Sequence, residues 1–168
     1  MLLLRANGAP VEIATPHGKV VSPNPELHRV YYDEWHFAPV RVEGDMVYAA
    51  GVAAVAGERP DEMGVLDLPK LENLFRRAWR DIQMHLEAAG SGTDCIVEMT
   101  SFHVFDSPHF KGSKWDHINA FRRVKDEFVS APYPAWTGIG AASLFPDGGI
   151  VEIRVVARLK SAAAKPAR

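Results

Sequence analysis

The segment that most constrains the fold of this chain runs from Pro134 to Leu159. It reads as two strands around a Pro-Asp-Gly-Gly turn, because proline presets φ and glycine permits positive φ between β-branched runs. The second strand carries an apolar residue at every other position: Val151, Ile153, Val155 and Ala157. These residues share one face of the strand and should cover a core.

Glu152 lies on the opposite face of that strand, with Ile150, Arg154, Val156 and Arg158. A carboxylate is not buried without partners, so this face is either solvated or turned toward another subunit or a ligand. The alternative interpretation is an ordinary charged strand face, on which Glu152 and Arg154 are oppositely charged neighbours. Glu152 is nevertheless the first candidate for chemistry.

Two helices are indicated between the strands. The first is expected from Pro69 to Ala89, where apolar residues recur at spacings of three and four: Leu71, Leu74, Phe75, Ala78, Ile82, Leu86 and Ala89. Trp79 and His85 are expected at the edge of that stripe. A strand from Cys95 to Phe105 follows, and Ser113-x-x-Asp116 opens the second helix as a capping box. Its buried row would be Ile118, Phe121, Val124 and Phe128, with Arg122, Arg123 and Lys125 outside.

The order of these elements predicts an α+β fold, with a mixed β-sheet and two helices packed on one face. Residues 1–36 are expected to form an N-terminal extension with a hairpin at Thr15-Pro16-His17-Gly18. Residues 37–160 would form the main domain, and residues 161–168 a disordered tail. The sheet face that carries Glu152 has no helix to cover it and therefore needs a partner.

Composition argues against several classes of function. With 19 Lys and Arg against 21 Asp and Glu, and a net charge of −2, the chain has no basic stripe for nucleic acid. No apolar run is long enough for a signal peptide or a membrane span. The single cysteine, Cys95, favours a reducing compartment, so we expect a cytoplasmic protein. Cys95 opens an apolar strand and is read as a small buried residue, not a nucleophile.

A group of potential metal ligands lies within a short stretch: His103, Asp106, His109, Asp116 and His117. Their spacing matches neither H-x-x-x-H nor H-E-x-x-H, and the intervening segments resemble a plain loop. We therefore expect no metal and no other cofactor.

Several segments, in a fixed order, resemble one known family. They are Gly44–Gly51, Leu86–Gly90, Ile96–Phe102, Ile118-Asn119-Ala120, Pro134-Ala135-x-Thr137, Leu144–Gly149 and Val151-Glu152-Ile153. Together they span about Phe37 to Leu159 and are similar to the RidA/YjgF family, trimeric enzymes that hydrolyse reactive enamines and imines. The resemblance implies a homotrimer with a small-molecule cleft between subunits.

The resemblance also assigns roles to single residues. It implies that Glu152 orients the attacking water, and that substrate is bound at Phe37, Gly51, Asn119, Trp136, Thr137 and Gly138. For Asn119, local capping of the helix start is an equally good interpretation.

Three of these positions depart from the family pattern. Trp136 stands where deaminating members have an arginine that grips a substrate carboxylate, and indole offers a single N–H without charge. Phe37 replaces an aromatic hydroxyl, and Gly138 replaces a small polar or thiol residue. The expected activity is a RidA-like hydrolase or deaminase with an altered substrate range. The alternatives are a non-catalytic metabolite-binding trimer that uses the same cleft, and an interaction or chaperone-like trimer.

Overall fold

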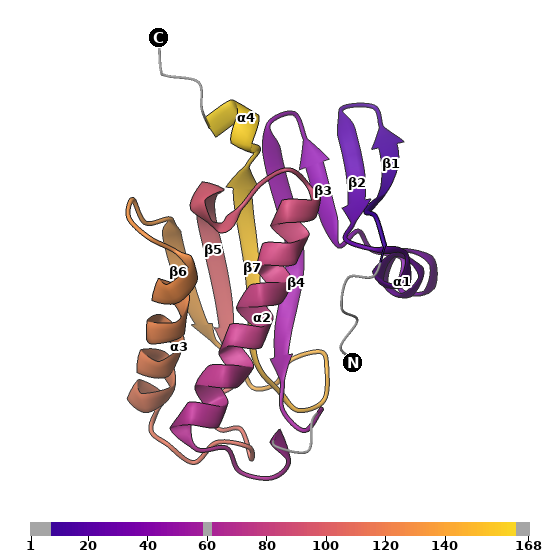
Figure 1. The fold of residues 1–168 in the computed structure, drawn as a ribbon. Helices are drawn as coiled ribbons and strands as arrows, with labels where there is room; N and C mark the ends of the chain where they lie inside the picture. Colours follow the sequence, from indigo (N-terminus) through magenta and orange to yellow (C-terminus); the bar gives the residue numbers. More distant parts are fainter. Residues whose placement is uncertain (1–7, 59–61, 164–168) are drawn as a thin grey trace. The chain divides into compact units, whose positions relative to one another are not determined.

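The computed structural model describes residues 8–58 and 62–163 and confirms the α+β class. Seven strands form a sheet in the order β1-β2-β3-β4-β7-β5-β6 (Figure 1). The strands are β1 (Val11–Thr15), β2 (Gly18–Ser22), β3 (Val40–Glu43), β4 (Met46–Val55), β5 (Ile96–His103), β6 (Ala135–Gly140) and β7 (Gly149–Arg158). The long helices are α2 (Leu68–Ala88) and α3 (Lys114–Phe128). Shorter helical segments are α1 (Pro25–Leu27), a π-helix (His28–Glu34), a 3₁₀ turn (Thr93–Cys95) and α4 (Lys160–Ala163).

The chain divides into two compact units. Within the described ranges, one comprises residues 51–58, 62–81 and 99–154, and the other residues 8–50, 82–98 and 155–163. Among the described residues, no helix combines the length and apolarity needed to cross a lipid bilayer.

The expected N-terminal hairpin is present in the second unit. β1 pairs antiparallel with β2 from Val11↔Ser22 to Thr15↔Gly18, which leaves Pro16 and His17 as the turn. β2 then pairs with β3, so the hairpin continues the sheet. The division of the chain at residue 36 stays a prediction. Of the expected disordered tail, residues 161–163 belong to α4 (Lys160–Ala163), and residues 164–168 lie outside the described part.

The first unit holds the two strands of the Pro134–Leu159 segment. They are β6 and β7, but β5 lies between them, so the Pro-Asp-Gly-Gly turn does not join neighbouring strands. α3 and the first part of α2 cover one side of this part of the sheet (Figure 1). Val151 and Ile153 are fully buried, as their period-two pattern predicted.

Two side chains of α2 were wrongly placed at the edge of the helix stripe. Trp79 is fully buried and His85 nearly so. The reason is helical geometry, because Phe75, Trp79 and Ile82 are spaced four and three residues apart and so share one face of the helix.

The start of α3 is as predicted. Ser113 is the N-cap, its hydroxyl accepts the Asp116 N–H at 3.1 Å, and the Asp116 carboxylate accepts the Ser113 N–H at 2.9 Å. The buried row of this helix was partly wrong, since it consists of His117, Ala120, Phe121, Val124 and Lys125. Ile118 and Phe128 are only half-buried, and Lys125 is buried although we expected it outside. Lys125 lies four residues after Phe121 and therefore on the same face.

Candidate functional site

The Glu152 carboxylate lies directly over Gly51 of the neighbouring strand. A Cβ atom built on Gly51 would come 2.0 Å from Glu152 Oε1 and 2.8 Å from Cδ. No side chain is compatible with such a distance, so glycine at this position is what allows the carboxylate to rest against the backbone of β4. The predicted pair Gly51 and Glu152 is therefore brought together within one chain.

The alternation of buried and unburied residues along β4 changes at Gly51. Val47 and Ala49 are buried, Ala50 and Gly51 are not, and burial resumes at Val52. Two successive unburied residues shift the pattern by one, as a β-bulge does. The shift leaves the backbone of Gly51 unburied beside Glu152.

Burial raises the pKa of the Glu152 carboxyl above its ordinary value. Within residues 8–58 and 62–163, this carboxylate has no hydrogen bond and no ion pair, so no positive group counteracts the desolvation. The side chain is half-buried and remains within reach of solvent. A carboxylate of raised basicity beside a bare backbone segment is suited to take a proton from a water molecule.

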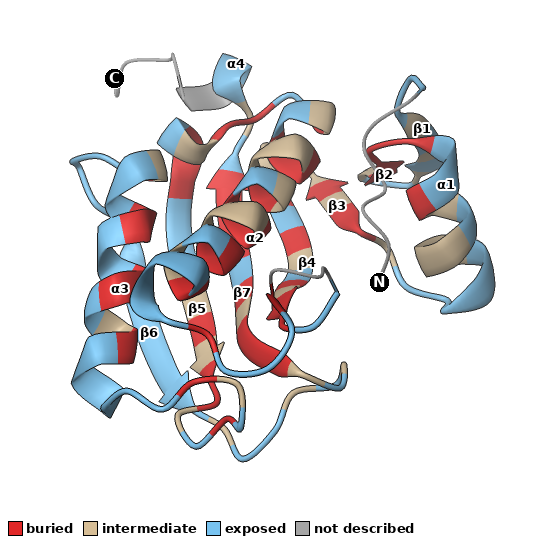
Figure 2. Ribbon diagram, turned by 60° about the horizontal axis from the view of Figure 1, so that its bottom comes forward, coloured by how far each residue is buried: buried red, intermediate tan, exposed pale blue. Residues whose placement is uncertain are grey.

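Trp136 lies on the other side of the sheet. Its indole Nε1–H donates to Ser101 Oγ at 2.8 Å, and its ring lies 5.7 Å from that of Phe121 on α3. The side chain therefore points to the helix-covered side, whereas Glu152 alternates with the buried Ile153 and points to the open side. β6 is the last strand of the sheet and is exposed along its length (Figure 2).

A buried chain of hydrogen bonds continues from Trp136 into the core. Ser101 Oγ is 2.8 Å from His103 Nε2, and His103 Nδ1 is 3.0 Å from His117 Nε2. Indole nitrogen can only donate, so Ser101 accepts from Trp136 and can give its own proton to His103. His103 then carries its proton on Nδ1 and donates to His117.

Both histidines are neutral in the native state. Burial lowers the pKa of His103 to about 3, with a contribution from His117, and lowers the pKa of His117 to about 4. His117 Nδ1 is buried without a hydrogen-bond partner among the described residues. This series of hydrogen bonds thus holds the Trp136 ring in place through groups that do not ionise at neutral pH.

The remaining predicted site residues are distributed as follows. Thr137 stands between Trp136 and Gly138, which both face the helix side. Because successive residues of a strand alternate, Thr137 shares the open side with Glu152. A Cβ on Gly138 would approach Ser101 Oγ and Trp136 Nε1, both at 3.9 Å, so this position faces the helix side. Asn119 lies exposed in the second turn of α3, where Ser113 already serves as the cap. Phe37 belongs to the other unit, with its ring 5.0 Å from that of Tyr31.

Sequence reasoning missed Ser101 and Lys125 and read His103 and His117 only as possible metal ligands. Met99, Ser101 and His103 alternate along β5, and this period of two was the available signal that they face the core together. Nothing in the sequence indicated that Ser101 would meet Trp136, because the two residues come from different strands.

In the described part of the chain, no three His, Cys, Asp or Glu side chains gather around a common point. His103 and His117 meet each other, whereas Asp116 is engaged in the helix cap and His109 Nδ1 is 3.2 Å from the Gly64 carbonyl. Cys95 is buried, and burial raises the pKa of its thiol, which disfavours the reactive thiolate.

Comparison with known proteins identifies close similarity over most of the chain. The family model described as endoribonuclease L-PSP matches residues 34–159. The RutC family protein YjgH of Escherichia coli (strain K12) is 32% identical over 133 residues, covering 79% of this chain and 88% of that protein. A solved structure of protein YjgH is 30% identical, with a TM-score of 0.55 over 76% of this chain and 87% of that one.

More distant structures share the fold. A putative endoribonuclease from Thermotoga maritima has a TM-score of 0.57 at 20% identity, covering 73% of this chain and 85% of that one. RidA from an Antarctic Psychrobacter has a TM-score of 0.52 at 23% identity, covering 73% of this chain and 87% of that one.

Proposed function

The chain belongs to the RidA/YjgF family, whose model is described as endoribonuclease L-PSP, and we propose that it is a small-molecule hydrolase or deaminase of the RidA type. Its substrate would carry an imine, an enamine or a related electrophile. The observation that carries this proposal is the half-buried Glu152 carboxylate, which rests on Gly51 with a raised pKa and no partner among the described residues. Ribonuclease activity is disfavoured, because a net charge of −2 provides no overall attraction for a phosphate backbone.

In the proposed reaction, Glu152 takes a proton from a water molecule while the water oxygen attacks the carbon of the C=N bond. The C=N π electrons move to nitrogen, which takes the proton held by Glu152 and gives a neutral carbinolamine. Glu152, again a carboxylate, then takes the hydroxyl proton of the carbinolamine and passes it to the departing nitrogen. The C–N bond breaks as the C=O bond forms, and a carbonyl compound and ammonia or an amine are released. A general base of this kind contributes about 10² to 10⁴ in rate.

The Trp136 contacts support an altered substrate range. The one N–H group of indole is already donated to Ser101, so Trp136 has no donor left for a substrate carboxylate. Substrates with an apolar or aromatic body should therefore be preferred over compact imino acids.

We further propose that the protein is a cytoplasmic homotrimer with its clefts between subunits. In one chain, Trp136 and Glu152 lie on opposite sides of the sheet, and β5 separates their strands. A cleft lined by both residues would thus take Trp136 from a second subunit. Tyr48, Val97 and Ile139 are exposed by 39–40% on strands, and an assembly would cover such side chains. Sedimentation should give a trimer at micromolar concentration, and a monomer there would contradict this part of the proposal.

A non-catalytic metabolite-binding trimer is the second candidate, favoured by the loss of a free donor at position 136. The deciding experiment measures ammonia release from imines generated in situ by an amino-acid oxidase, with neutral aliphatic and aromatic amino acids compared. We expect turnover with the aromatic imines and a loss of at least about a hundredfold in Glu152→Gln. The kcat/KM of the native protein should fall as the pH drops through the raised pKa of Glu152, because the base must be deprotonated.

Glu26→Gln is the matched control, since Glu26 is an exposed carboxylate in α1. It should leave the rate unchanged. Turnover that survives Glu152→Gln would refute the assigned role of Glu152. Binding of an imine without turnover, in both the native protein and Glu152→Gln, would favour the second candidate.

A further inference from the structure

The residue that lies opposite Glu152 on the next strand is Phe102, as the backbone hydrogen bonds show. Val104 donates its N–H to the Ile150 carbonyl at 2.9 Å, which joins the end of β5 to the start of β7. These neighbouring strands therefore run antiparallel (Figure 1). Two residues back along β5 lie opposite two residues forward along β7, so Phe102 is paired with Glu152.

The direction of the side chains agrees with this register. Along both strands, the residues next to Phe102 and Glu152 are fully buried on the helix side: Ser101, His103, Val151 and Ile153. Because successive side chains alternate, Phe102 and Glu152 both point to the open side. Directly opposite side chains of an antiparallel pair have Cβ atoms about 4.5–5.5 Å apart, so the phenyl ring stands beside the carboxylate.

Phe102 and Gly51 thus flank the Glu152 carboxylate from two different strands. On β4, the bare backbone of Gly51 leaves the space that Glu152 Oε1 occupies. On β5, the phenyl ring carries no polar group that could pair with a carboxylate. Phe102 is half-buried, as is Glu152. The carboxylate is therefore partly desolvated without gaining a hydrogen bond from either neighbour.

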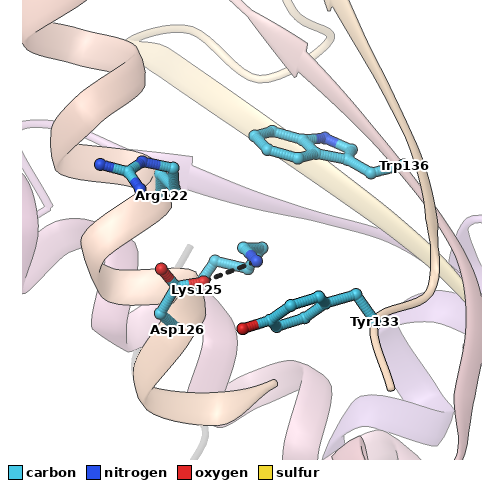
Figure 3. A pocket seen from close by; sticks show the side chains of 5 residues that line it. All are labelled: Arg122, Lys125, Asp126, Tyr133 and Trp136. Carbon is cyan, nitrogen blue, oxygen red and sulfur yellow. Dashed lines mark ion pairs between the residues drawn. The ribbon is translucent and has the colours of Figure 1, made fainter. Parts of the chain in front are cut away.

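Burial, and not a neighbouring charge, raises the pKa of Glu152. Arg154, two residues further along β7, is the nearest charged residue on the same face of that strand. Lys125 and Asp126 lie with Trp136 on the helix side and do not face Glu152 (Figure 3). The other strands of this unit turn uncharged residues to the open side: Gly51, Thr100, Phe102, Thr137 and Ile139.

We propose that Phe102 is the positioning residue of Glu152: its ring excludes water from one side of the carboxylate and holds it against Gly51. This inference rests on the hydrolase role proposed above, in which the carboxylate takes a proton from the attacking water. The basicity of Glu152 then depends on the size and apolarity of the side chain at position 102, because a smaller side chain admits water to the charged form.

The test follows the carboxyl carbon resonance of Glu152 by NMR as the pH changes, with the resonance assigned by its loss in Glu152→Gln. In Phe102→Ala, the pKa of Glu152 should fall toward its ordinary value, because water then solvates the carboxylate. Phe102→Leu keeps an apolar side chain and should keep the pKa raised. If Phe102→Ala does not fold, Phe102→Thr opens the same space with a β-branched residue that suits a strand.

The pH dependence of turnover should follow the titration. In Phe102→Ala, kcat/KM should fall at a lower pH than in the native protein, because the base stays deprotonated to a lower pH. The value of kcat at neutral pH should drop by about tenfold, since the carboxylate is a weaker base and is less well aligned.

Phe128→Ala is the matched control, because Phe128 is also half-buried but stacks on Trp79 at 5.8 Å on the helix side. It should lower stability without moving the titration of Glu152. The proposal is overturned if Phe102→Ala leaves this titration unchanged, or if Phe128→Ala shifts it equally. A native protein that releases no ammonia would instead contradict the hydrolase role, and the carboxyl titration would still decide whether Phe102 shields Glu152.

Discussion

The carboxylate of Glu152 occupies the space that any side chain at position 51 would require, since Oε1 lies 2.0 Å from the ideal Cβ position of Gly51. We therefore predict that Gly51→Ala displaces the carboxylate. The atoms in conflict belong to the end of a flexible side chain, so the free energy of unfolding should change by less than about 1 kcal/mol. Activity should fall by about a hundredfold, because a base displaced by 1 Å loses its alignment. Steady-state kinetics and urea unfolding measure the two effects.

A double-mutant cycle provides the control for this prediction. Glu152→Asp shortens the acid by one methylene group and withdraws it from the added methyl. The loss caused by Gly51→Ala should thus be smaller in the Glu152→Asp background than in the native protein. If the double mutant loses activity by the product of the two single-mutant factors, the two residues are not coupled. The steric conflict between Gly51→Ala and the Glu152 carboxylate would then not be the cause of the activity loss.

How far the sequence predicts this molecule is clear from β7 and α3. The burial of Val151, Ile153 and Val155 was expected from the chain's own pleat and is confirmed. Ile150 and Val156 on the Glu152 face are buried as well, which the alternation did not predict. The capping box at Ser113 is equally local and was equally predictable. Which strands lie side by side is not local, and β5 is inserted between β6 and β7 although these two are nearest in sequence.

In the candidate site too, features set by local sequence could be predicted and features set by distant elements could not. Family resemblance selected Gly51 and Glu152, and their contact requires only that β4 and β7 be neighbours. It could not indicate the side of the sheet on which the Trp136 ring lies, because that depends on Ser101 and Phe121 from other elements. Lys125 was read as a surface cation for a related reason, since its burial depends on rings contributed by Tyr133 and Trp136.

The buried histidines predict sensitivity to acid. His103 and His117 have native pKa values of about 3 and about 4, below the ordinary 6.5 that they recover on unfolding. Below pH 6.5 the unfolded state therefore binds more protons than the native state, and stability falls as the pH drops toward 4. Each histidine should contribute roughly 1.4 kcal/mol per pH unit at most in this range. Urea unfolding between pH 7 and pH 4.5 measures the slope.

His117→Gln isolates the contribution of one member of the pair. It should reduce by about half the histidine contribution to the change of unfolding free energy with pH, whatever its effect on stability at pH 7. His17→Gln is the matched control, because His17 lies exposed in the β1–β2 turn. A slope that His117→Gln leaves unchanged would assign the acid sensitivity to other groups.

The last prediction concerns Ser101, the link between Trp136 and the histidines. Ser101→Ala removes the acceptor of the indole N–H and the donor to His103 Nε2 in one step. Because Ser101 and His103 are fully buried, no water replaces these bonds, and we expect a loss of about 1–3 kcal/mol in the free energy of unfolding. The Trp136 N–H resonance should move toward the position of a solvent-exposed indole. Thr137→Ala, on the exposed side of β6, should change stability by less than about 0.5 kcal/mol. An equal effect of both substitutions would show that the hydrogen-bond chain does not fix the Trp136 ring.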